Sequence, residues 1–288
     1  MSEISNKKSI AQKVAGKIIL YIVLCTLAVV FLYPYGFMLN RGLMSNERIT
    51  SSHMYYFTDS LHFENYYLAF RDGGYLMPLL RSVFVCGITA LSAPLTTLIA
   101  AYAFSKLEWI GKNFLFGFMM MLAIVPGIVT QVPLFVLYHS LNLIDTLYPL
   151  FLPGLFSAGI MSIFLMRQFL LGLSKEIEES AMLEGAGPLT RCFYICAPLC
   201  KAMLIYLAVT SFMGAWGDFY TPSVYMPGED APFTFAAKLY YMTGRETNSA
   251  HPEWIFAAAT IMSLVSTVLY IFFQKYLIEG IATAGLKS

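Results

Sequence analysis

The sequence is short of charged residues. Of its 288 residues only 12% are Asp, Glu, Lys or Arg, about half the share in a typical soluble domain, and the net charge is +1. The basic residues form no cluster, which argues against a nucleic-acid-binding face. Hydrophobic residues make up 58% of the chain. A single water-soluble core cannot bury that much apolar surface, so we expect a membrane protein.

Groups that serve catalysis are scarce as well. The chain has no GxxxxGK[ST] phosphate loop, so it does not hydrolyse ATP by P-loop chemistry. All four histidines fall in or beside segments that we place outside the membrane, which disfavours a buried proton relay or an intramembrane metal site. These are His53, His62, His139 and His251.

The five cysteines do not suggest a disulfide framework. Cys25 and Cys86 lie in apolar runs, and the other three repeat at a spacing of four residues. These three are Cys192, Cys196 and Cys200. We interpret them as small packed apolar residues; a metal site is the alternative, but no histidine lies nearby.

Long windows with almost no charge are the clearest positive signal. A helix needs about 20 apolar residues to cross about 30 Å of hydrocarbon, and six windows meet this requirement. Prolines interrupt the third and fourth windows, which is tolerated where neighbouring helices or a water-filled cavity satisfy the freed backbone groups. The sequence therefore predicts an all-α integral membrane protein with six transmembrane helices. The predicted spans are residues 18–39, 81–105, 113–138, 147–170, 202–226 and 255–276.

The distribution of Lys and Arg predicts the orientation. With the N-terminus inside, the inner segments hold twelve basic residues and the outer segments six, so both termini are expected in the cytoplasm of a cell-membrane protein. The first window lacks the small residues of a cleavage site, so we expect a retained anchor and not a signal peptide. The segments outside the spans are cytoplasmic tails at 1–17 and 277–288, external loops at 40–80 and 227–254, and an inner segment at 174–198. The external loops either contact an external partner or are ordinary solvated loops.

The inner segment has the pattern of a helix-turn-helix. Ser174 is a suitable N-cap, and carboxylates follow in the first turns, where the helix dipole favours them. Gly185 and Gly187 suit a turn, and Pro188 suits the first position of a second helix that runs until Pro198.

On the first of these helices we expect an apolar stripe of Ile177 and Ala181, joined by Met182 or Leu183, to pack on the protein, and Glu178, Ser180 and Glu184 to point elsewhere. Taken alone, such a segment is most often an amphipathic interfacial helix.

The same segment resembles a known family. Glu179-Ser180-Ala181, then Gly185, then Ile195-Cys196-Ala197-Pro198 are similar to the EAA-x3-G-x9-I-x-L-P motif of binding-protein-dependent ABC importer permeases. Ser180 and Ala197 depart from the motif by small or apolar changes. Residues 100–113, 214–219 and 273–287 extend the resemblance, and the last of them looks like the maltose-type, carbohydrate-uptake branch.

The resemblance implies a division of labour between subunits. The chain would be a non-enzymatic permease that binds no cofactor, while ATP and Mg²⁺ bind to two cytoplasmic ATPase subunits. The helix-turn-helix would dock in a groove of the ATPase, and a second permease, in a heterodimer or a homodimer, and an external solute-binding protein would complete the importer. The residues implied for ATPase coupling are Glu179, Ser180, Ala181, Glu184, Gly185, Ala186 and Pro198.

A second group of residues suggests a substrate pathway. Asp218 is the one acidic residue in an otherwise apolar run, about 25 Å along a helix from Lys201 and near the outer edge of the membrane. With Trp216, Phe219 and Tyr220 it would offer aromatic faces and a carboxylate to a sugar. The alternative is a helix-end residue bonded to backbone.

Other functions remain as alternatives. An ion-coupled secondary transporter would need ionisable residues near the midplane or paired repeats, and an intramembrane enzyme would need a nucleophile and base inside the bilayer. We find neither pattern. An ABC permease for a polyamine, a phosphate ester or a peptide would carry the same coupling motif.

Overall fold

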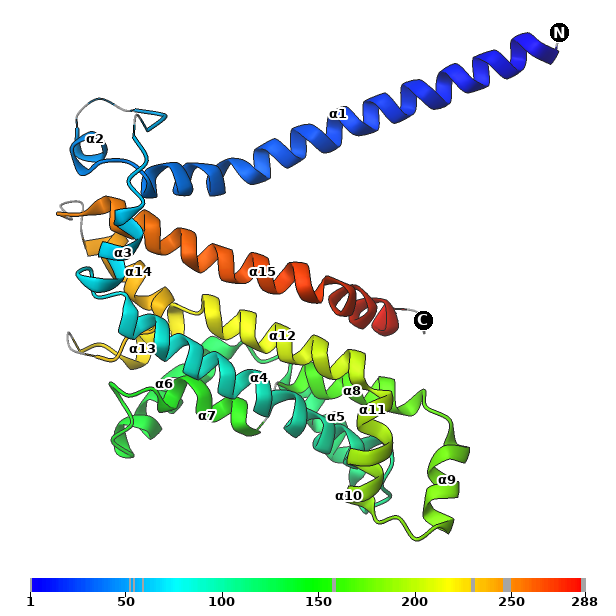
Figure 1. Ribbon diagram of the computed structural model, residues 1–288. Coiled ribbons are helices and arrows are strands. Elements are labelled where there is room, and N and C mark those ends of the chain that lie inside the picture. The colour runs from blue at the N-terminus through cyan, green and yellow to red at the C-terminus, as the bar shows by residue number, and fades with distance from the viewer. Residues whose placement is uncertain are drawn as a thin grey trace. The chain divides into compact units, whose positions relative to one another are not determined.

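The protein is described by a computed structural model covering residues 2–285 except 52, 54, 59, 157–158, 229–230 and 246–249. Every regular element within these residues is helical, which confirms the all-α prediction. The chain divides into two compact units, residues 1–73 with 248–263, and residues 74–247 with 264–288. Figure 1 shows the helices of both units in colour order along the chain.

The first unit holds three helices and the start of a fourth. They are α1 (Ser2–Gly42), α2 (Asn46–Thr50), α3 (Glu64–Arg71) and the first part of α15 (Pro252–Gly285). The end of α1 lies close to α15, because a Cβ added at Gly42 would be 3.0 Å from the backbone nitrogen of Ala257. The buried Asn65 amide donates to the carbonyls of Gly42 and Met44, at 3.1 and 2.9 Å, and so satisfies the end of α1.

The second unit is built around α4 (Leu76–Ser105), which packs along α12 (Lys201–Gly217). Small buried residues repeat along α4 at spacings of three and four, and such residues let membrane helices approach closely. They include Ser82, Cys86, Thr89, Ala93, Thr97 and Ala101. Leu98 of α4 and Leu207 of α12 share a buried core with Met166 of α8 (Ile160–Leu171). A Cβ on Gly154 of α7 (Tyr148–Phe156) would meet the Thr89 side chain at 3.1 Å, so α4 and α7 are also in close contact.

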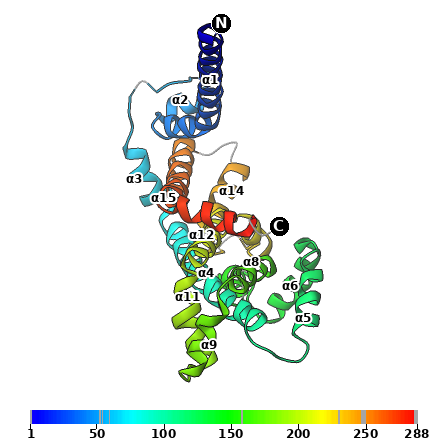
Figure 2. The same cartoon turned by 90° about the vertical axis from the view of Figure 1, so that its right-hand side faces the viewer.

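Two of the predicted spans are formed by pairs of shorter helices. The predicted span 113–138 is α5 (Lys112–Leu122) and α6 (Gly127–Ser140), which meet at 97° and are seen in Figure 2. The predicted span 147–170 is α7 (Tyr148–Phe156) and α8 (Ile160–Leu171), and residues 157–158 of that prediction lie outside the described residues. Within the described residues, four stretches are long and apolar enough to cross a membrane: Val14–Gly42, Leu76–Ser105, Tyr148–Leu171 and Pro252–Ile278. The number rises to six if two bent pairs each count as one span, Lys112–Leu122 with Gly127–Ser140 and Pro188–Leu199 with Lys201–Gly217.

Several helix ends differ from the predicted boundaries. The helix predicted at 202–226 ends at Gly217, and a short α13 (Tyr220–Tyr225) follows, because Asp218 leaves the helical conformation at φ −75° and ψ 107°. The predicted cytoplasmic tails, 1–17 and 277–288, are largely continuations of the neighbouring helices. Helix α1 begins at Ser2 and α15 ends at Gly285, and no proline interrupts either stretch.

The predicted external loops contain helices. Residues 40–80 hold α2, α3 and the first turn of α4, which starts five residues before the predicted position 81. Residues 227–254 hold α14 (Phe235–Arg245) and the start of α15, and positions 229–230 and 246–249 of that loop lie outside the described residues.

Candidate functional site

The segment that resembles the coupling motif forms two helical stretches joined by a turn. The first is α9 (Lys175–Leu183), and the second comprises α10 (Pro188–Thr190), the π-helical turn η1 (Arg191–Cys196) and α11 (Ala197–Leu199). Ser174 stands at the N-cap of α9, and its hydroxyl donates to the Glu176 carboxylate. This hydrogen bond lowers the pKa of Glu176.

The turn after α9 depends on Gly185. Its φ of +83° lies in the left-handed region that favours glycine. Its N–H donates to the Met182 carbonyl at 3.0 Å, and the Ala186 N–H donates to the Ala181 carbonyl at 2.9 Å. This pair of bonds is a Schellman motif, which satisfies the last carbonyls of the helix. Backbone geometry therefore favours glycine at this position.

The packed face of α9 carries a carboxylate. Glu178 is buried, its Oε2 lies 3.0 Å from Lys106 Nζ, and its Oε1 accepts a hydrogen bond of 3.1 Å from the Tyr102 hydroxyl. The two side chains of the ion pair are only 11% and 8% exposed. Tyr102 lies in the last turn of α4 and Lys106 is its C-cap, so α9 is fixed to the end of α4.

The prediction that Glu178 points away from the packed face is therefore wrong. Ala181 does pack inward, but the expected apolar partners do not, since Ile177, Met182 and Leu183 are all exposed in the single chain. The reason is that Lys106 and Tyr102 supply a charged and a hydrogen-bonding partner for Glu178, which lowers the cost of burying it.

The second stretch is held by the buried cysteines. Cys192, Cys196 and Cys200 are free thiols that pack with Leu98 and Tyr102 of α4 in the core of the second unit. Pro188 occupies the first helical turn, as predicted from its fixed φ. The stretch passes Pro198 and ends at Cys200, where the chain turns by 84° into α12.

Most of the residues implied for ATPase coupling are at least partly exposed, and Ala181 is the buried exception. Glu179, Ser180, Glu184 and Gly185 are exposed, Ala186 is half-buried and Pro198 is exposed. Exposed apolar side chains lie among them, and the most exposed are Leu183, Leu189 and Tyr194. A mixed apolar and acidic surface of this kind suits a protein partner, because single soluble chains seldom leave such side chains uncovered.

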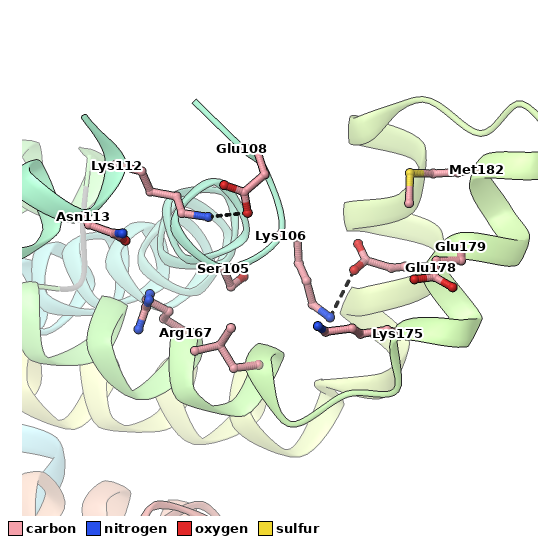
Figure 3. Close-up of a pocket in the computed structure, with 11 residues that line it drawn as sticks. Ser105, Lys106, Glu108, Lys112, Asn113, Arg167, Lys175, Glu178, Glu179 and Met182 are labelled. Atoms are coloured by element: carbon pink, nitrogen blue, oxygen red, sulfur yellow. Dashed lines mark hydrogen bonds and ion pairs between the residues drawn. The ribbon is translucent and has the colours of Figure 1, made fainter. Parts of the chain in front are cut away.

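A cavity of about 430 Å³ lies between α9 and the ends of the neighbouring helices (Figure 3). It is lined by the last residues of α4, the first turn of α5, the last turn of α8 and one face of α9. Four of the lining residues are cationic and three are acidic. Sequence reasoning missed this cavity, because its residues come from two segments, 105–113 and 167–182, that are far apart in the sequence.

The residues predicted for a substrate pathway do not share one environment. Asp218 caps the end of α12, and its Oδ1 accepts a hydrogen bond of 2.9 Å from the Thr221 N–H. This is the geometry of a helix-end residue bonded to backbone. Trp216 is buried between Phe212 and Phe235, so its ring offers no free face.

Phe219 and Tyr220 are exposed and each has a partner that sequence reasoning missed. The Phe219 ring stacks on Tyr240 of α14 with centroids 4.7 Å apart. The Tyr220 hydroxyl donates to Gln131 Oε1 of α6 at 2.9 Å. The stacked rings of Phe219 and Tyr240 and the hydrogen-bonded pair of Tyr220 and Gln131 are thus exposed near breaks in two apolar helices. No spacing in the sequence indicated Gln131 or Tyr240.

Comparisons with known proteins agree with the motif. A family model described as a binding-protein-dependent transport system inner membrane component matches residues 93–283. The chain is similar to the arabinooligosaccharides transport system permease protein AraQ of Halalkalibacterium halodurans, with 28% identity over 231 residues covering 80% of this chain and 81% of AraQ. It is also similar to the maltodextrin transport system permease protein MalD of Streptococcus pneumoniae, with 27% identity over 230 residues covering 79% of this chain and 81% of MalD.

A solved structure shows the same fold. The crystal structure of a bacterial ABC transporter involved in the import of the acidic polysaccharide alginate contains a chain that superimposes with a TM-score of 0.73. The match has 21% sequence identity and covers 90% of this chain and 95% of that one.

Proposed function

The chain belongs to the family of binding-protein-dependent transport system inner membrane components, whose model matches about two thirds of it, and we propose that its cargo is a carbohydrate. Membership makes it a membrane permease subunit of an ABC importer, a class in which a partner subunit is the ATPase. The proposal for the cargo rests on the names of relatives such as AraQ and MalD, which are permeases for oligosaccharides.

For the mechanism, we propose that the stretch 174–198 faces the cytoplasm and docks on an ATPase subunit. The single observation that carries this is the anchoring of α9 to α4 by Glu178 and Lys106, beside an exposed surface of Glu179, Leu183 and the Gly185 turn. An element that receives force must be rigid and tied to a spanning helix. A buried, hydrogen-bonded ion pair supplies such a tie, because separating its charges leaves one of them uncompensated.

The proposed assembly has six membrane spans per permease with both termini in the cytoplasm. It contains a second, related permease, two ATPase subunits that bind ATP and Mg²⁺, and an external solute-binding protein. This permease binds no cofactor of its own. When the ATPase pair closes, α9 and α4 move together and change the side of the membrane to which the pathway opens.

For the pathway, we propose that Phe219, Tyr220, Tyr240 and Gln131 contact the sugar. Stacked aromatic faces suit the apolar face of a pyranose, and an amide with a phenol suits its hydroxyl groups. Asp218 contributes by holding the chain at the end of α12, and Trp216 supports Phe212 and Phe235 from within the core.

The test is purification of the tagged chain from its native membrane, with partners identified by mass and uptake measured after reconstitution. Recovery of an ATPase with a phosphate loop, a second permease and ATP-dependent sugar uptake supports the proposal. Recovery of the same ATPase with uptake of a polyamine or a peptide would replace the cargo and leave the coupling mechanism in place.

A further inference from the structure

The cavity beside α9 contains cations that the protein itself does not neutralise. Within the described residues, Glu178 is paired with Lys106, and Glu108 is paired with Lys112 at 2.9 Å. Arg167 and Lys175 line the same cavity and have no acidic partner in the part of the chain that the structure describes. The third lining carboxylate, Glu179, is exposed and forms no ion pair among the described residues, so the lining carries four cations against three carboxylates. The unbalanced charge of the lining is therefore positive.

Arg167 is held in a fixed orientation. Its Nε donates to the Phe104 carbonyl at 3.1 Å, and its guanidinium lies 4.3 Å from the centre of the Phe116 ring. Because one edge and one face are engaged, the two terminal nitrogens remain available to a planar or tetrahedral oxyanion. Figure 3 shows the guanidinium among the residues that line the cavity, with Lys112 and Asn113 on the adjacent ribbon.

The start of α5 adds to the positive potential. Lys112 and Asn113 occupy its first turn, the N-cap is Gly111, and no acidic residue is present in that turn. The 11-residue helix therefore directs the positive end of its dipole towards the cavity without a side chain to compensate it. This feature strengthens the site that Arg167 and Lys175 define.

The cavity adjoins an exposed apolar surface. Phe114, Leu115 and Phe118 follow immediately on α5 and are exposed in the single chain, with Phe114 80% exposed. A ligand that fits both surfaces has an anionic head and apolar tails. A soluble anion would use only the cavity, and an acidic side chain of a protein partner would leave the apolar side chains uncovered.

We propose that this cavity binds the phosphate of an anionic phospholipid, with Arg167 and Lys175 as the main contacts and the acyl chains along α5. The placement rests on the proposed orientation, in which the ends of α4 and α8 and the start of α5 reach the inner face of the membrane, where anionic headgroups attract basic side chains. Because α9 forms one wall, the bound lipid also steadies the coupling segment.

The experiment measures lipid retained by the intact importer. The complex is reconstituted in nanodiscs of phosphatidylcholine with 20% phosphatidylglycerol and stripped in detergent, and the two lipids that remain are quantified by mass spectrometry. We expect phosphatidylglycerol to be enriched over phosphatidylcholine, and its retention to fall about fivefold for each cation removed. The variants are Lys175→Gln, which alters an exposed side chain, and Arg167→Gln, with Lys201→Gln on the exposed start of α12 as the matched control.

The outcomes separate the candidate ligands. Equal retention in Lys175→Gln, Arg167→Gln and Lys201→Gln overturns the proposal. Displacement of the lipid by millimolar inorganic phosphate would identify a site for free anions instead. Enrichment in the permease pair purified without the ATPase, but not in the intact importer, would assign the cavity to the ATPase. Retention is read without ATP or sugar, so an importer that retains the lipid but transports no carbohydrate refutes the proposed cargo alone.

Discussion

Glu178 of α9 and Lys106 at the end of α4 form a buried ion pair of 3.0 Å, and the Tyr102 hydroxyl completes the carboxylate's hydrogen bonding. A pair of this kind is costly to break, because removal of one partner leaves the other charged and poorly solvated. The contact joins the proposed coupling segment to a helix long enough to cross the membrane.

Removing either side of this pair is expected to loosen α9. Glu178→Gln or Lys106→Met should each lower the free energy of unfolding by about 3 kcal/mol and reduce the amount of uptake per ATP hydrolysed. The double variant should lose less free energy of unfolding than the sum of the losses in the two single variants. Thermal unfolding in detergent and the amount of uptake per ATP hydrolysed are measured for the single and double variants, which gives a double-mutant cycle. The exposed Glu176→Gln serves as the control. Additive effects of the two substitutions would mean that Glu178 and Lys106 do not stabilise each other.

Substitutions at Gly185 test the turn after α9. Its φ of +83° should make Gly185→Val unfavourable by about 1–2 kcal/mol, whereas Gly185→Asn should be tolerated because Asn enters this region more readily. We expect membrane insertion to persist and uptake to separate from ATP hydrolysis in the Val variant only. Gly187→Ala is the matched control, since its φ of −68° is ordinary and its Cβ would meet open space. Normal uptake in Gly185→Val would remove the coupling role of the turn.

Asp218 distinguishes a structural from a substrate-binding carboxylate. Asp218→Ala removes the acceptor for the Thr221 N–H and should cost about 1 kcal/mol of stability, while Asp218→Asn keeps that acceptor. If the carboxylate serves only this bond to the start of α13, Asp218→Asn should transport with an unchanged KM for the sugar. A raised KM in Asp218→Asn at unchanged stability would place the carboxylate in the pathway.

The exposed aromatic pair should affect sugar affinity and not ATP turnover. Tyr240→Leu removes one of two rings stacked at 4.7 Å, so we expect the KM for sugar uptake to rise about tenfold while basal ATP hydrolysis is unchanged. Tyr67→Leu, an exposed tyrosine on α3, serves as the control. Equal kinetics in both variants would exclude the Phe219–Tyr240 surface from the pathway.

In the first unit, the close approach at Gly42 makes a stability prediction. A Cβ there would lie 3.0 Å from the Ala257 backbone, so Gly42→Ala should force a shift and cost about 1–3 kcal/mol. Gly36→Ala on the same helix meets nothing within 4 Å and should be neutral or slightly stabilising. Thermal unfolding of the two variants checks the difference, and equal melting temperatures would contradict the packing of α1 on α15.

The parts of this structure that sequence could predict are those set by local chemistry. Charge-free windows located the apolar helices, Gly185 marked the left-handed turn, and Pro188 marked the start of the second stretch. Glu178 could not be placed, because a carboxylate in an amphipathic helix is usually solvated and its partner Lys106 is far away in the sequence. Likewise, nothing local showed that Trp216 is enclosed by Phe212 and Phe235.

The contact between α9 and an ATPase is the central claim, and site-specific photocrosslinking tests it most directly. A photoreactive amino acid is placed at Leu183, which is 91% exposed, and in a matched variant at the exposed Ile128 on α6. The account predicts a crosslink from position 183 to the ATPase subunit, with a yield that changes when ATP is added, and none from position 128. The absence of an ATPase crosslink from position 183 in a complex that transports sugar would contradict it.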